Sequence, residues 1–262
     1  EEFLLNGQID VAVHSLKDVP TELSKGLTIA AVLPREDPAD VLVSKRASSL
    51  GEIRSGGLIG TSSPRRARQL QHVRPDLEIV DVRGNVPTRL HKLMKQPHWD
   101  GLILARAGLE RLNLIHAGRV HFGDNLLFAF TLESMLPAAG QGAIALEVLE
   151  KSTVIREVLQ PVNDPATWFC VHAEREFLRL LGGGCEVPIG VRARVSQPVR
   201  FAGAGNVPDS GKTECLAGQQ ALLEAIVFEE NDIVRTGSIS GSFASAELAA
   251  QTLFRNIYGD GR

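Results

Sequence analysis

The chain has 262 residues, of which 44% are apolar and 23% are charged. This balance supplies a large core and argues against a disordered chain, and the length suggests about two domains. No run approaches the ~18 apolar residues that span a bilayer, and EEFLLNGQID lacks the basic start of a secretory signal. Because the three cysteines show no paired spacing, we expect no disulfide framework and a cytoplasmic location.

Charge is distributed unevenly along the chain. Residues 40–120 carry 14 Lys and Arg against 7 Asp and Glu, a net charge of +7, whereas the remaining residues carry −10. A basic section in a mildly acidic protein favours a local anionic ligand. Nucleic acid is the alternative, but this section holds a single aromatic residue, Trp99, and no basic-aromatic pattern for base stacking. We therefore expect no nucleic-acid partner.

The first half of the chain alternates between strand and helix patterns. After a short helical start, strands are predicted at 9–15 and 27–33, and a Pro- and Asp-rich turn at 34–40 suits a domain crossing. Strand-then-helix units follow at 56–71, 77–95 and 101–114. Short apolar strands that alternate with helices predict an α/β fold with mainly parallel sheets.

The second half changes character. A Pro/Gly break within 127–149 is a candidate for the second crossing between domains. An amphipathic helix is predicted at 165–181, with Asp164 as N-cap and Pro165 at N1. Residues 185–262 mix short strands with a final helix near 244–257, which indicates a small α+β domain.

The segment GTSSPRR (60–66) is the sharpest local signal. Ser63 as N-cap and Pro64 at N1 predict a helix that begins directly after a strand. Thr61 and Ser63 place hydroxyls beside the unpaired helix-terminal N–H groups, and Arg65 and Arg66 add two cationic forks. The segment is either an anion site or a capped surface helix with solvated arginines.

The segment VRGNVPTRL (82–90) repeats this arrangement after the next strand, with Arg83, Asn85 and Arg89. Sequential strand ends in a parallel sheet open on the same edge, so these arginines are expected to converge with Arg65 and Arg66. A third unit adds Arg106 and Arg111. Several arginines around one mouth indicate a ligand with several carboxylates or phosphates. Because neither a Walker lysine motif nor G-x-G-x-x-G occurs, a nucleotide is disfavoured.

Two further segments carry candidate reactive groups. In HSLKDVP (14–20), a turn enforced by Pro20 exposes Lys17 and Asp18. An ionised Asp18 among cations could stabilise a cationic intermediate or relay a proton; the alternative is an ordinary Lys-Asp turn. In GGGCEVPIG (182–190), three glycines leave the Cys185 thiol uncrowded, as a nucleophile or attachment point requires. No second Cys or His stands at ligand spacing, so we expect no metal site.

Five motifs in this order resemble one family. AVHSLKDVP, GTSSPRR, VRGNVPTRL, LPAAGQGAIALE and GGGCEVPIG are similar to those of hydroxymethylbilane synthase (porphobilinogen deaminase), and the resemblance covers residues 1 to about 195. It implies three domains, of which the first two resemble periplasmic binding proteins. The implied boundaries are 1–34 with 143–160 for domain 1, 39–136 for domain 2 and 161–262 for domain 3.

The resemblance also implies the chemistry. Four porphobilinogens are joined head to tail into hydroxymethylbilane with release of ammonia, on a dipyrromethane cofactor attached by a thioether at the position of Cys185. Asp18 matches the catalytic aspartate. The residues implied for binding the carboxylates of cofactor and substrate are Lys17, Ser15, Thr61, Ser63, Arg65, Arg66, Arg83, Asn85, Arg89 and Arg111. The expected protein is a monomer whose domains move as the product grows.

The sequence also departs from the family in two places. About sixty N-terminal residues of the family, including a first strand, have no counterpart before Glu1, which would leave a sheet edge unpaired. Residues 196–222 match the third domain poorly. A truncated inactive relative and a non-catalytic polycarboxylate-binding protein with the same fold are therefore the alternatives.

Overall fold

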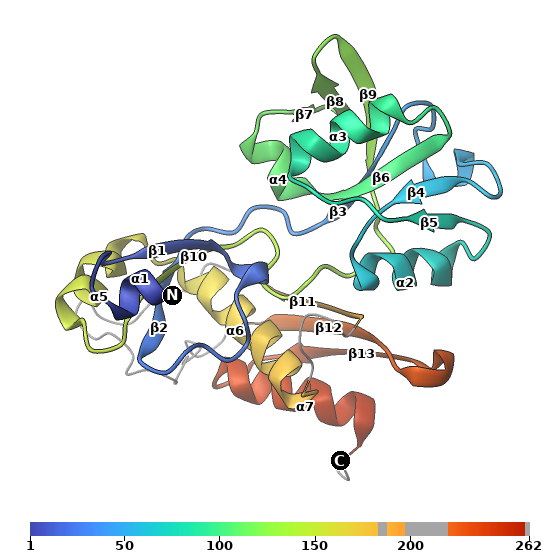
Figure 1. Cartoon of the computed structure of the whole chain (residues 1–262). Helices are drawn as coiled ribbons and strands as arrows, with labels where there is room; N and C mark the ends of the chain where they lie inside the picture. The colour runs from blue at the N-terminus through green and yellow to red at the C-terminus, as the bar shows by residue number, and fades with distance from the viewer. Residues whose placement is uncertain (183–187, 197–219, 260–262) are drawn as a thin grey trace. The chain divides into compact units, whose positions relative to one another are not determined.

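A computed structural model of the chain describes residues 1–182, 188–196 and 220–259. The chain forms two compact units (Figure 1). Unit 1 comprises residues 1–36 and 138–262, and unit 2 comprises residues 37–137. The chain therefore passes from one unit to the other twice, after residue 36 and after residue 137. The finer division into three domains stays a prediction.

The first part of unit 1 is a small antiparallel sheet with the order β1-β10-β2. Its strands are β1 (Ala12–Ser15), β10 (Ile144–Leu149) and β2 (Leu27–Val32), and the helical segments around it are α1 (Glu2–Leu5), η1 (Leu16–Asp18), α5 (Thr153–Leu159) and η3 (Gln160–Val162). Leu16, Val32 and Ala145 lie in one buried cluster together with Val171 from the long helix α6 (Pro165–Leu180). The two separate stretches of chain that make up unit 1 thus share one core.

The second part of unit 1 is an antiparallel sheet with the order β11-β12-β13, packed against α6 and α7 (Figure 1). The bounds are β11 (Ile189–Val195), β12 (Ala221–Phe228), η4 (Glu230–Asp232), β13 (Val234–Gly241) and α7 (Ala246–Tyr258). Phe169 and Phe177 of α6 are buried against this sheet. As predicted, α6 begins with Asp164, which accepts a hydrogen bond from the Thr167 N–H, and with Pro in its first turn.

Unit 2 is built on a seven-stranded sheet with the order β5-β4-β6-β3-β9-β8-β7. Its elements in chain order are β3 (Asp40–Ser44), η2 (Leu50–Glu52), β4 (Leu58–Gly60), α2 (Pro64–Val73), β5 (Glu78–Val80), α3 (Val86–Lys95), β6 (Trp99–Ala105), α4 (Arg106–Arg111), β7 (Ile115–His116), β8 (Arg119–Phe122) and β9 (Asn125–Thr131). Buried aliphatic residues from β3 and β6 form cores on both faces of this sheet.

The expected α/β class is confirmed, with one correction to the sheets. Parallel pairing is confined to β5-β4-β6, and the other described pairs are antiparallel. The difference has two causes. Strand β3, which follows the first chain crossing, pairs antiparallel with β6 on one side and with β9, which precedes the second crossing, on the other. Strands β8 and β9 form a hairpin at Gly123, which has a φ of +57°. Strands β3, β7 and β8 were not predicted from the sequence, and β9 and β10 were not assigned as strands.

Candidate active site

One edge of unit 2 gathers most of the predicted binding residues. Strands β4, β5 and β6 are parallel, so their last residues Gly60, Val80 and Ala105 lead to the same edge of the sheet. The first two loops are joined directly: the Ser62 hydroxyl donates to the Val82 carbonyl at 2.5 Å and accepts from the Val82 N–H at 3.1 Å. The expected common edge is therefore present in the structure.

Two helices begin at this edge with polar N-caps. The Ser63 hydroxyl accepts from the Arg66 N–H at 3.4 Å, and the side-chain Oδ1 of Asn85 accepts from the Thr88 N–H at 2.9 Å. Thr61 is buried, and its hydroxyl accepts from the Ser63 N–H. Ser63, Asn85 and Thr61 thus hold the starts of α2 and α3, whose N-terminal dipoles favour an anion.

Arg65 and Arg66 are buried and share one carboxylate. Arg65 Nη1 lies 2.6 Å from Asp40 Oδ2, and Arg66 Nη2 lies 2.8 Å from Asp40 Oδ1. The Asp40 side chain is fully buried. Neither arginine is the solvated surface cation considered in the sequence analysis, because a buried guanidinium needs a counter-charge and hydrogen-bond acceptors.

Burial sets the electrostatics of this cluster. Desolvation lowers the pKa of Arg65, and the Asp40 carboxylate opposes that effect. Two guanidinium groups and one carboxylate leave an excess of one positive charge at the start of α2. That excess charge makes the cluster suited to a ligand carboxylate.

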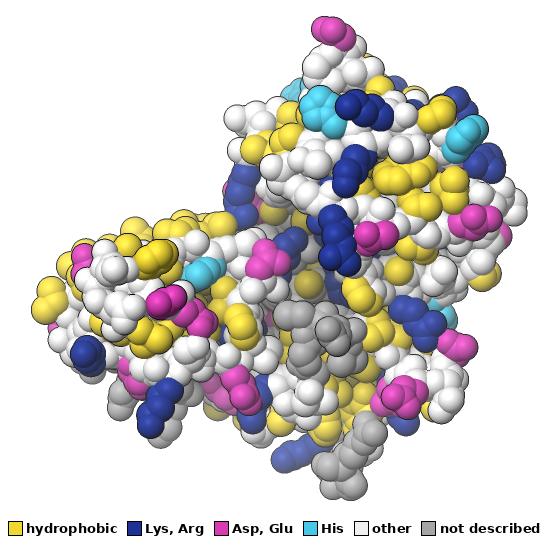
Figure 2. Space-filling view, viewed as in Figure 1, with side chains coloured by type: hydrophobic (Ala, Val, Ile, Leu, Met, Phe, Trp, Pro, Cys, Tyr) yellow, Lys and Arg dark blue, Asp and Glu magenta, His cyan; other side chains and the backbone are white. Residues whose placement is uncertain are grey.

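The other arginines of this edge are less constrained. Arg83 is 84% exposed and lies 3.4 Å from Asp81, whose pKa is lowered by the Ser62 hydroxyl and then by Arg83. Arg89 donates from Nε to the Gly84 carbonyl at 2.7 Å, and Arg111 ends α4 as an exposed residue. Figure 2 shows more Lys and Arg than Asp and Glu side chains on the visible face of unit 2.

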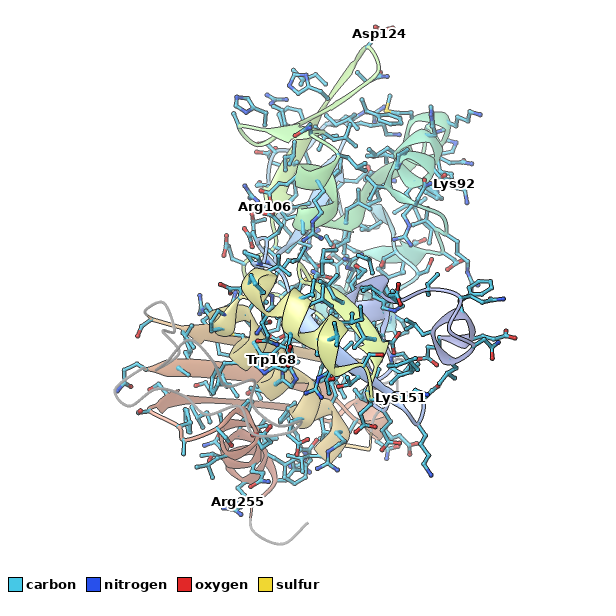
Figure 3. All side chains as sticks on the ribbon, turned by 90° about the vertical axis from the view of Figure 1, so that its left-hand side faces the viewer. Lys92, Arg106, Asp124, Lys151, Trp168 and Arg255 are labelled. Atoms are coloured by element: carbon cyan, nitrogen blue, oxygen red, sulfur yellow. The ribbon has the colours of Figure 1, made fainter. Side chains whose placement is uncertain are left out.

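Arg106 behaves differently from its neighbours. Its Nε lies 2.7 Å from Glu110 and 3.4 Å from Asp37, and the Glu110 carboxylate raises its pKa (Figure 3). Because two acids surround this guanidinium, it contributes little net charge to the edge. Arg106 therefore fits a structural role at the start of α4.

In unit 1, Asp18 lies on a rigid turn. Leu16 and Val19 are buried and anchor η1, and the Leu16 N–H donates to the Ala143 carbonyl at 3.0 Å. Between these anchors Asp18 is exposed and Lys17 is partly exposed. Ser15, at the end of β1, is exposed as well. The turn thus presents a carboxylate to solvent on a backbone that the core holds.

Two supports of this turn were missed by the sequence analysis. Arg175 on α6 donates to the carbonyls of Val19 and Thr21 at 2.9 and 3.2 Å. Gly140 has a φ of +69°, and a Cβ there would lie 2.9 Å from Leu16 Cγ. The glycine in LPAAGQG therefore lets this loop pack directly on the turn.

A buried ion pair also escaped the sequence analysis. Both Glu174 oxygens accept from Arg35, at 2.7 and 3.0 Å, and from the N–H groups of Gly140 and Ala193 at 2.8 Å. Glu174 is fully buried, so it joins the loop that supports η1 to α6 and β11. The sequence signals were the charged Glu174 at an apolar position of its helix and Arg35 in the PREDPAD turn.

Two further features of unit 1 concern the predicted thiol and the contact of a partly exposed histidine with a buried glutamate. Cys185 and most of residues 196–222 lie outside the described residues, whereas Cys170 of α6 is buried. His14 Nε2 lies 2.8 Å from Glu147, which is fully buried. This contact gives His14 a structural partner.

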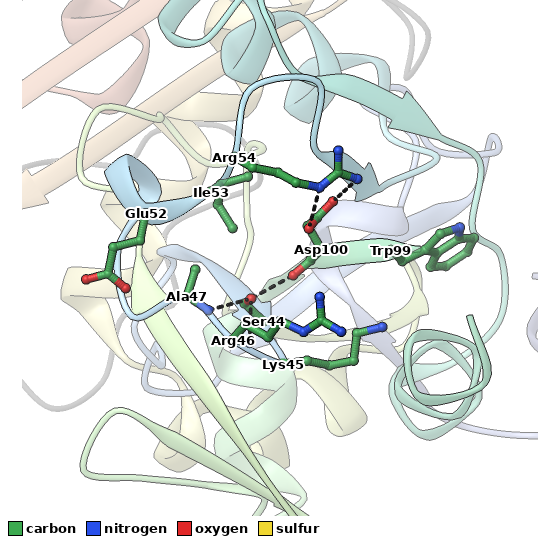
Figure 4. Close-up of a pocket in the computed structure, with 9 residues that line it drawn as sticks. All are labelled: Ser44, Lys45, Arg46, Ala47, Glu52, Ile53, Arg54, Trp99 and Asp100. Atoms are coloured by element: carbon green, nitrogen blue, oxygen red, sulfur yellow. Dashed lines mark hydrogen bonds and ion pairs between the residues drawn. The ribbon is translucent and has the colours of Figure 1, made fainter. Parts of the chain in front are cut away.

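A separate basic pocket lies at the opposite edge of unit 2 (Figure 4). It is lined by residues that follow β3, by η2 and by the start of β6, including Lys45, Arg46, Arg54 and Trp99. Arg54 is paired with Asp100 at 2.9 Å, and burial together with Arg46 lowers the pKa of Lys45. None of the predicted site residues lines this pocket.

Comparison with solved structures gives weak likenesses. The periplasmic VFT2 domain of Bordetella pertussis BvgS has a TM-score of 0.38 at 15% identity, and the aligned part covers 62% of this chain and 63% of that one. A putative lipoprotein from Clostridium difficile also scores 0.38, at 17% identity over 62% of this chain and 72% of that one. Likenesses at this level carry no argument about function.

Comparison with curated sequences gives a much stronger result. A porphobilinogen deaminase of Listeria welshimeri is 43% identical over 98% of this chain and 78% of its own length, and that of Moorella thermoacetica is 48% identical over 98% and 73%. The family model described as porphobilinogen deaminase, dipyromethane cofactor binding domain, matches residues 1–157, and that of the C-terminal domain matches residues 168–256. The chain therefore belongs to the porphobilinogen deaminase family.

Proposed function

We propose that the chain acts as a hydroxymethylbilane synthase, a transferase that joins four porphobilinogens head to tail and releases four ammonia molecules in tetrapyrrole biosynthesis. The observation that carries the proposal is the match of both family models, because these cover the segments that bear Asp18 and the arginines of unit 2. The resemblance of the five motifs supports the same conclusion.

The charges of unit 2 fit a dipyrromethane cofactor and its extensions. Each pyrrole unit carries an acetate and a propionate, so a bound chain gains two negative charges with every addition. Arg83 is exposed, and Arg65 and Arg66 carry an excess positive charge at the start of α2. We assign the binding of these carboxylates to the predicted set, Lys17, Ser15, Thr61, Ser63, Arg65, Arg66, Arg83, Asn85, Arg89 and Arg111, and the covalent attachment to Cys185.

The Asp18 carboxylate is assigned the catalytic role. When bound, the cofactor supplies the nucleophilic pyrrole end to which each new unit is joined. Asp18 stays close to the substrate ring nitrogen and stabilises the positive charge that develops as ammonia leaves. Its fixed position on η1 reduces the reorganisation that this stabilisation would otherwise need.

The oligomeric state, the location and the partners also belong to this proposal. We expect a monomer in the cytoplasm, without a nucleic-acid or membrane partner. Within the described residues, no helix has both the length and the apolar character needed to cross a bilayer. Size-exclusion chromatography with light scattering would test the monomer directly.

Turnover of porphobilinogen tests the proposal. We expect ammonia and hydroxymethylbilane to form in a ratio of four to one, with the product measured as uroporphyrin after cyclisation and oxidation. Cys185→Ser is expected to abolish turnover, and Cys215→Ser serves as the matched control. Binding of porphobilinogen without turnover by the unaltered chain would instead identify a non-catalytic binding protein or an inactive relative.

A further inference from the structure

The basic pocket at the end of β3 and the start of β6 is held together by hydrogen bonds of its own (Figure 4). The buried Ser44 hydroxyl donates to the Asp100 carbonyl at 2.6 Å and accepts from two backbone N–H groups of the turn that follows, at 3.2 and 3.1 Å. The Asp100 carboxylate accepts from Arg54 Nη2 and from the Leu58 N–H, at 2.9 Å in each case. The segments that line the pocket are thus fixed to one another without a ligand.

The charges of this pocket are unequal. Three cations and two carboxylates line it: Lys45, Arg46, Arg54, Glu52 and Asp100. Arg54 pairs with Asp100 at 2.9 Å. The Glu52 carboxylate accepts two hydrogen bonds from its own loop, at 2.7 and 2.9 Å, and these lower its pKa. Because both acids are engaged, the surplus positive charge belongs to Lys45 and Arg46.

These two cations lie close enough to repel each other. Burial and then the charge of Arg46 lower the pKa of Lys45. Within the part of the chain that the structure describes, Lys45 Nζ donates only to the carbonyls of Gln96 and Pro97, at 2.6 and 3.5 Å, which leaves one of its three N–H donors for a ligand. An anion that accepts from both Lys45 and Arg46 would therefore replace a repulsion by two charge-assisted hydrogen bonds.

The pocket also has an apolar lining. Ala47 and Ile53 are buried, and the ring of Trp99 is partly exposed beside them. The volume of the pocket is about 150 Å³. Pockets for drug-sized ligands hold about 300–1,000 Å³, so this one suits a smaller molecule, on the scale of a single ring. A flat apolar ring packs well against an indole.

We propose that this pocket binds a small aromatic carboxylate, whose ring packs against Trp99 and Ile53 and whose carboxylate accepts from Lys45 and Arg46. An inorganic anion would leave the apolar lining in water, and a neutral ring would leave the two cations without a counter-charge. None of the residues assigned to porphobilinogen or its cofactor lines the pocket. The proposal is thus a second anion site in unit 2, and it does not rest on the proposed function.

Nuclear magnetic resonance of the whole chain, labelled with ¹⁵N in tryptophan, tests the proposal with benzoate as the probe. The chain has two tryptophans, Trp99 in the pocket and Trp168 on α6 in unit 1, and Trp99→Phe assigns their indole N–H signals. We expect benzoate to shift the Trp99 signal until it saturates and to leave the Trp168 signal in place. Benzamide has the ring without the charge, and acetate has the charge without the ring. Each should need at least about tenfold more ligand for half-saturation.

Substitutions at the two cations test the carboxylate contact. Lys45→Gln and Arg46→Gln should each raise the benzoate concentration at half-saturation by about fivefold or more, because each removes a charged donor. Arg46 is exposed, so its loss leaves the fold intact. Lys151→Gln removes an exposed cation of unit 1 and is the matched control, with benzoate binding unchanged.

Four results would overturn the proposal. The first is a Trp99 signal that does not move with benzoate, and the second is a Trp168 signal that moves equally. The third is half-saturation by benzoate that stays the same in both Lys45→Gln and Arg46→Gln. The fourth is binding of benzamide, acetate or inorganic phosphate as tight as that of benzoate, which would replace the aromatic carboxylate by a neutral ring or a simple anion.

Discussion

Asp18 in unit 1 and Asp40 in unit 2 lie in opposite environments, although each has a cationic neighbour. The neighbour of Asp18 is Lys17 in the sequence, and those of Asp40 are two arginines in the fold. Asp18 is exposed, on a turn whose neighbours Leu16 and Val19 are buried. Asp40 is buried, and its two oxygens accept from Arg65 and Arg66. An aspartate whose backbone is anchored keeps its carboxylate available for a reaction. An aspartate whose carboxylate is paired with buried arginines instead stabilises the fold.

This comparison has an energetic side. A carboxylate that remains in solvent costs little to place, so Asp18 can be changed without loss of stability. A carboxylate that is buried between two arginines cannot be removed without leaving uncompensated charge. The two positions should therefore separate in any experiment that measures activity and stability together.

The strongest expected effect is on turnover at Asp18. Asp18→Asn should lower kcat by about 10³-fold, because the carboxylate that stabilises the developing positive charge is lost. The melting temperature should remain within about 1 °C of the unaltered chain, since the side chain is exposed. Steady-state kinetics and thermal melts measure both, with Asp10→Asn as an exposed control in the same unit. A kcat close to normal would remove Asp18 from the mechanism.

The next effect concerns a second buried carboxylate, Glu174 in unit 1. Glu174→Gln should lower the free energy of unfolding by about 3 kcal/mol, because it breaks a buried pair with Arg35. Urea denaturation measures this loss. Glu176→Gln, in a pair whose Arg179 partner is 52% exposed, should cost less than about 1 kcal/mol. Equal losses at the two positions would contradict the role of burial.

A smaller effect is expected at the loop that supports Asp18. Gly140→Ala should destabilise the protein by about 2 kcal/mol, since the residue has a positive φ and its Cβ would meet Leu16 at 2.9 Å. It should also lower kcat, because η1 must shift. Gly7→Ala, with a φ of +66° and no atom within 4 Å of its Cβ, isolates the backbone term. Unchanged kcat in Gly140→Ala would show that η1 needs no such support.

The smallest expected effect concerns pH. Burial lowers the pKa of His172 to about 4, and its ring packs at a tilt of 32° against the ring of Trp168, which Figure 3 labels. Above the unfolded pKa of about 6.5 the histidine is neutral in both states and does not change the free energy of unfolding. Between pH 6.5 and 4 the unfolded state binds more protons than the folded state. Stability should therefore fall by about 2 kcal/mol as the pH drops from 7 to 5. His172→Gln should remove that part of the slope in urea titrations; an unchanged slope would assign it to other groups.

The sequence could predict the features that depend on neighbouring residues. Ser63 and Asp164 are N-caps as expected, because a cap needs only the next three residues. Asn85, which was predicted only as part of a tight turn, is the N-cap of α3. The shared edge of β4, β5 and β6 was also predicted, since strand-to-helix repeats imply parallel pairing.

The buried charges could not be predicted in the same way. Asp40 was interpreted as part of a polar turn, whereas it begins the buried strand β3. The two arginines that balance its charge lie 25 and 26 residues away on α2, so no local pattern reveals the pairing. The apolar run VLVS directly after it was the available signal for β3. Strands β7 and β8 are short and partly exposed, so their pattern was too weak to separate from a loop.

The measurement that tests the account most directly is the intact mass of the purified chain before and after incubation with porphobilinogen. The account predicts an added mass equal to a dipyrromethane that is present in Cys215→Ser and absent in Cys185→Ser. An unmodified mass in all three proteins after incubation would contradict the assignment of Cys185 and, with it, the synthase activity of this chain.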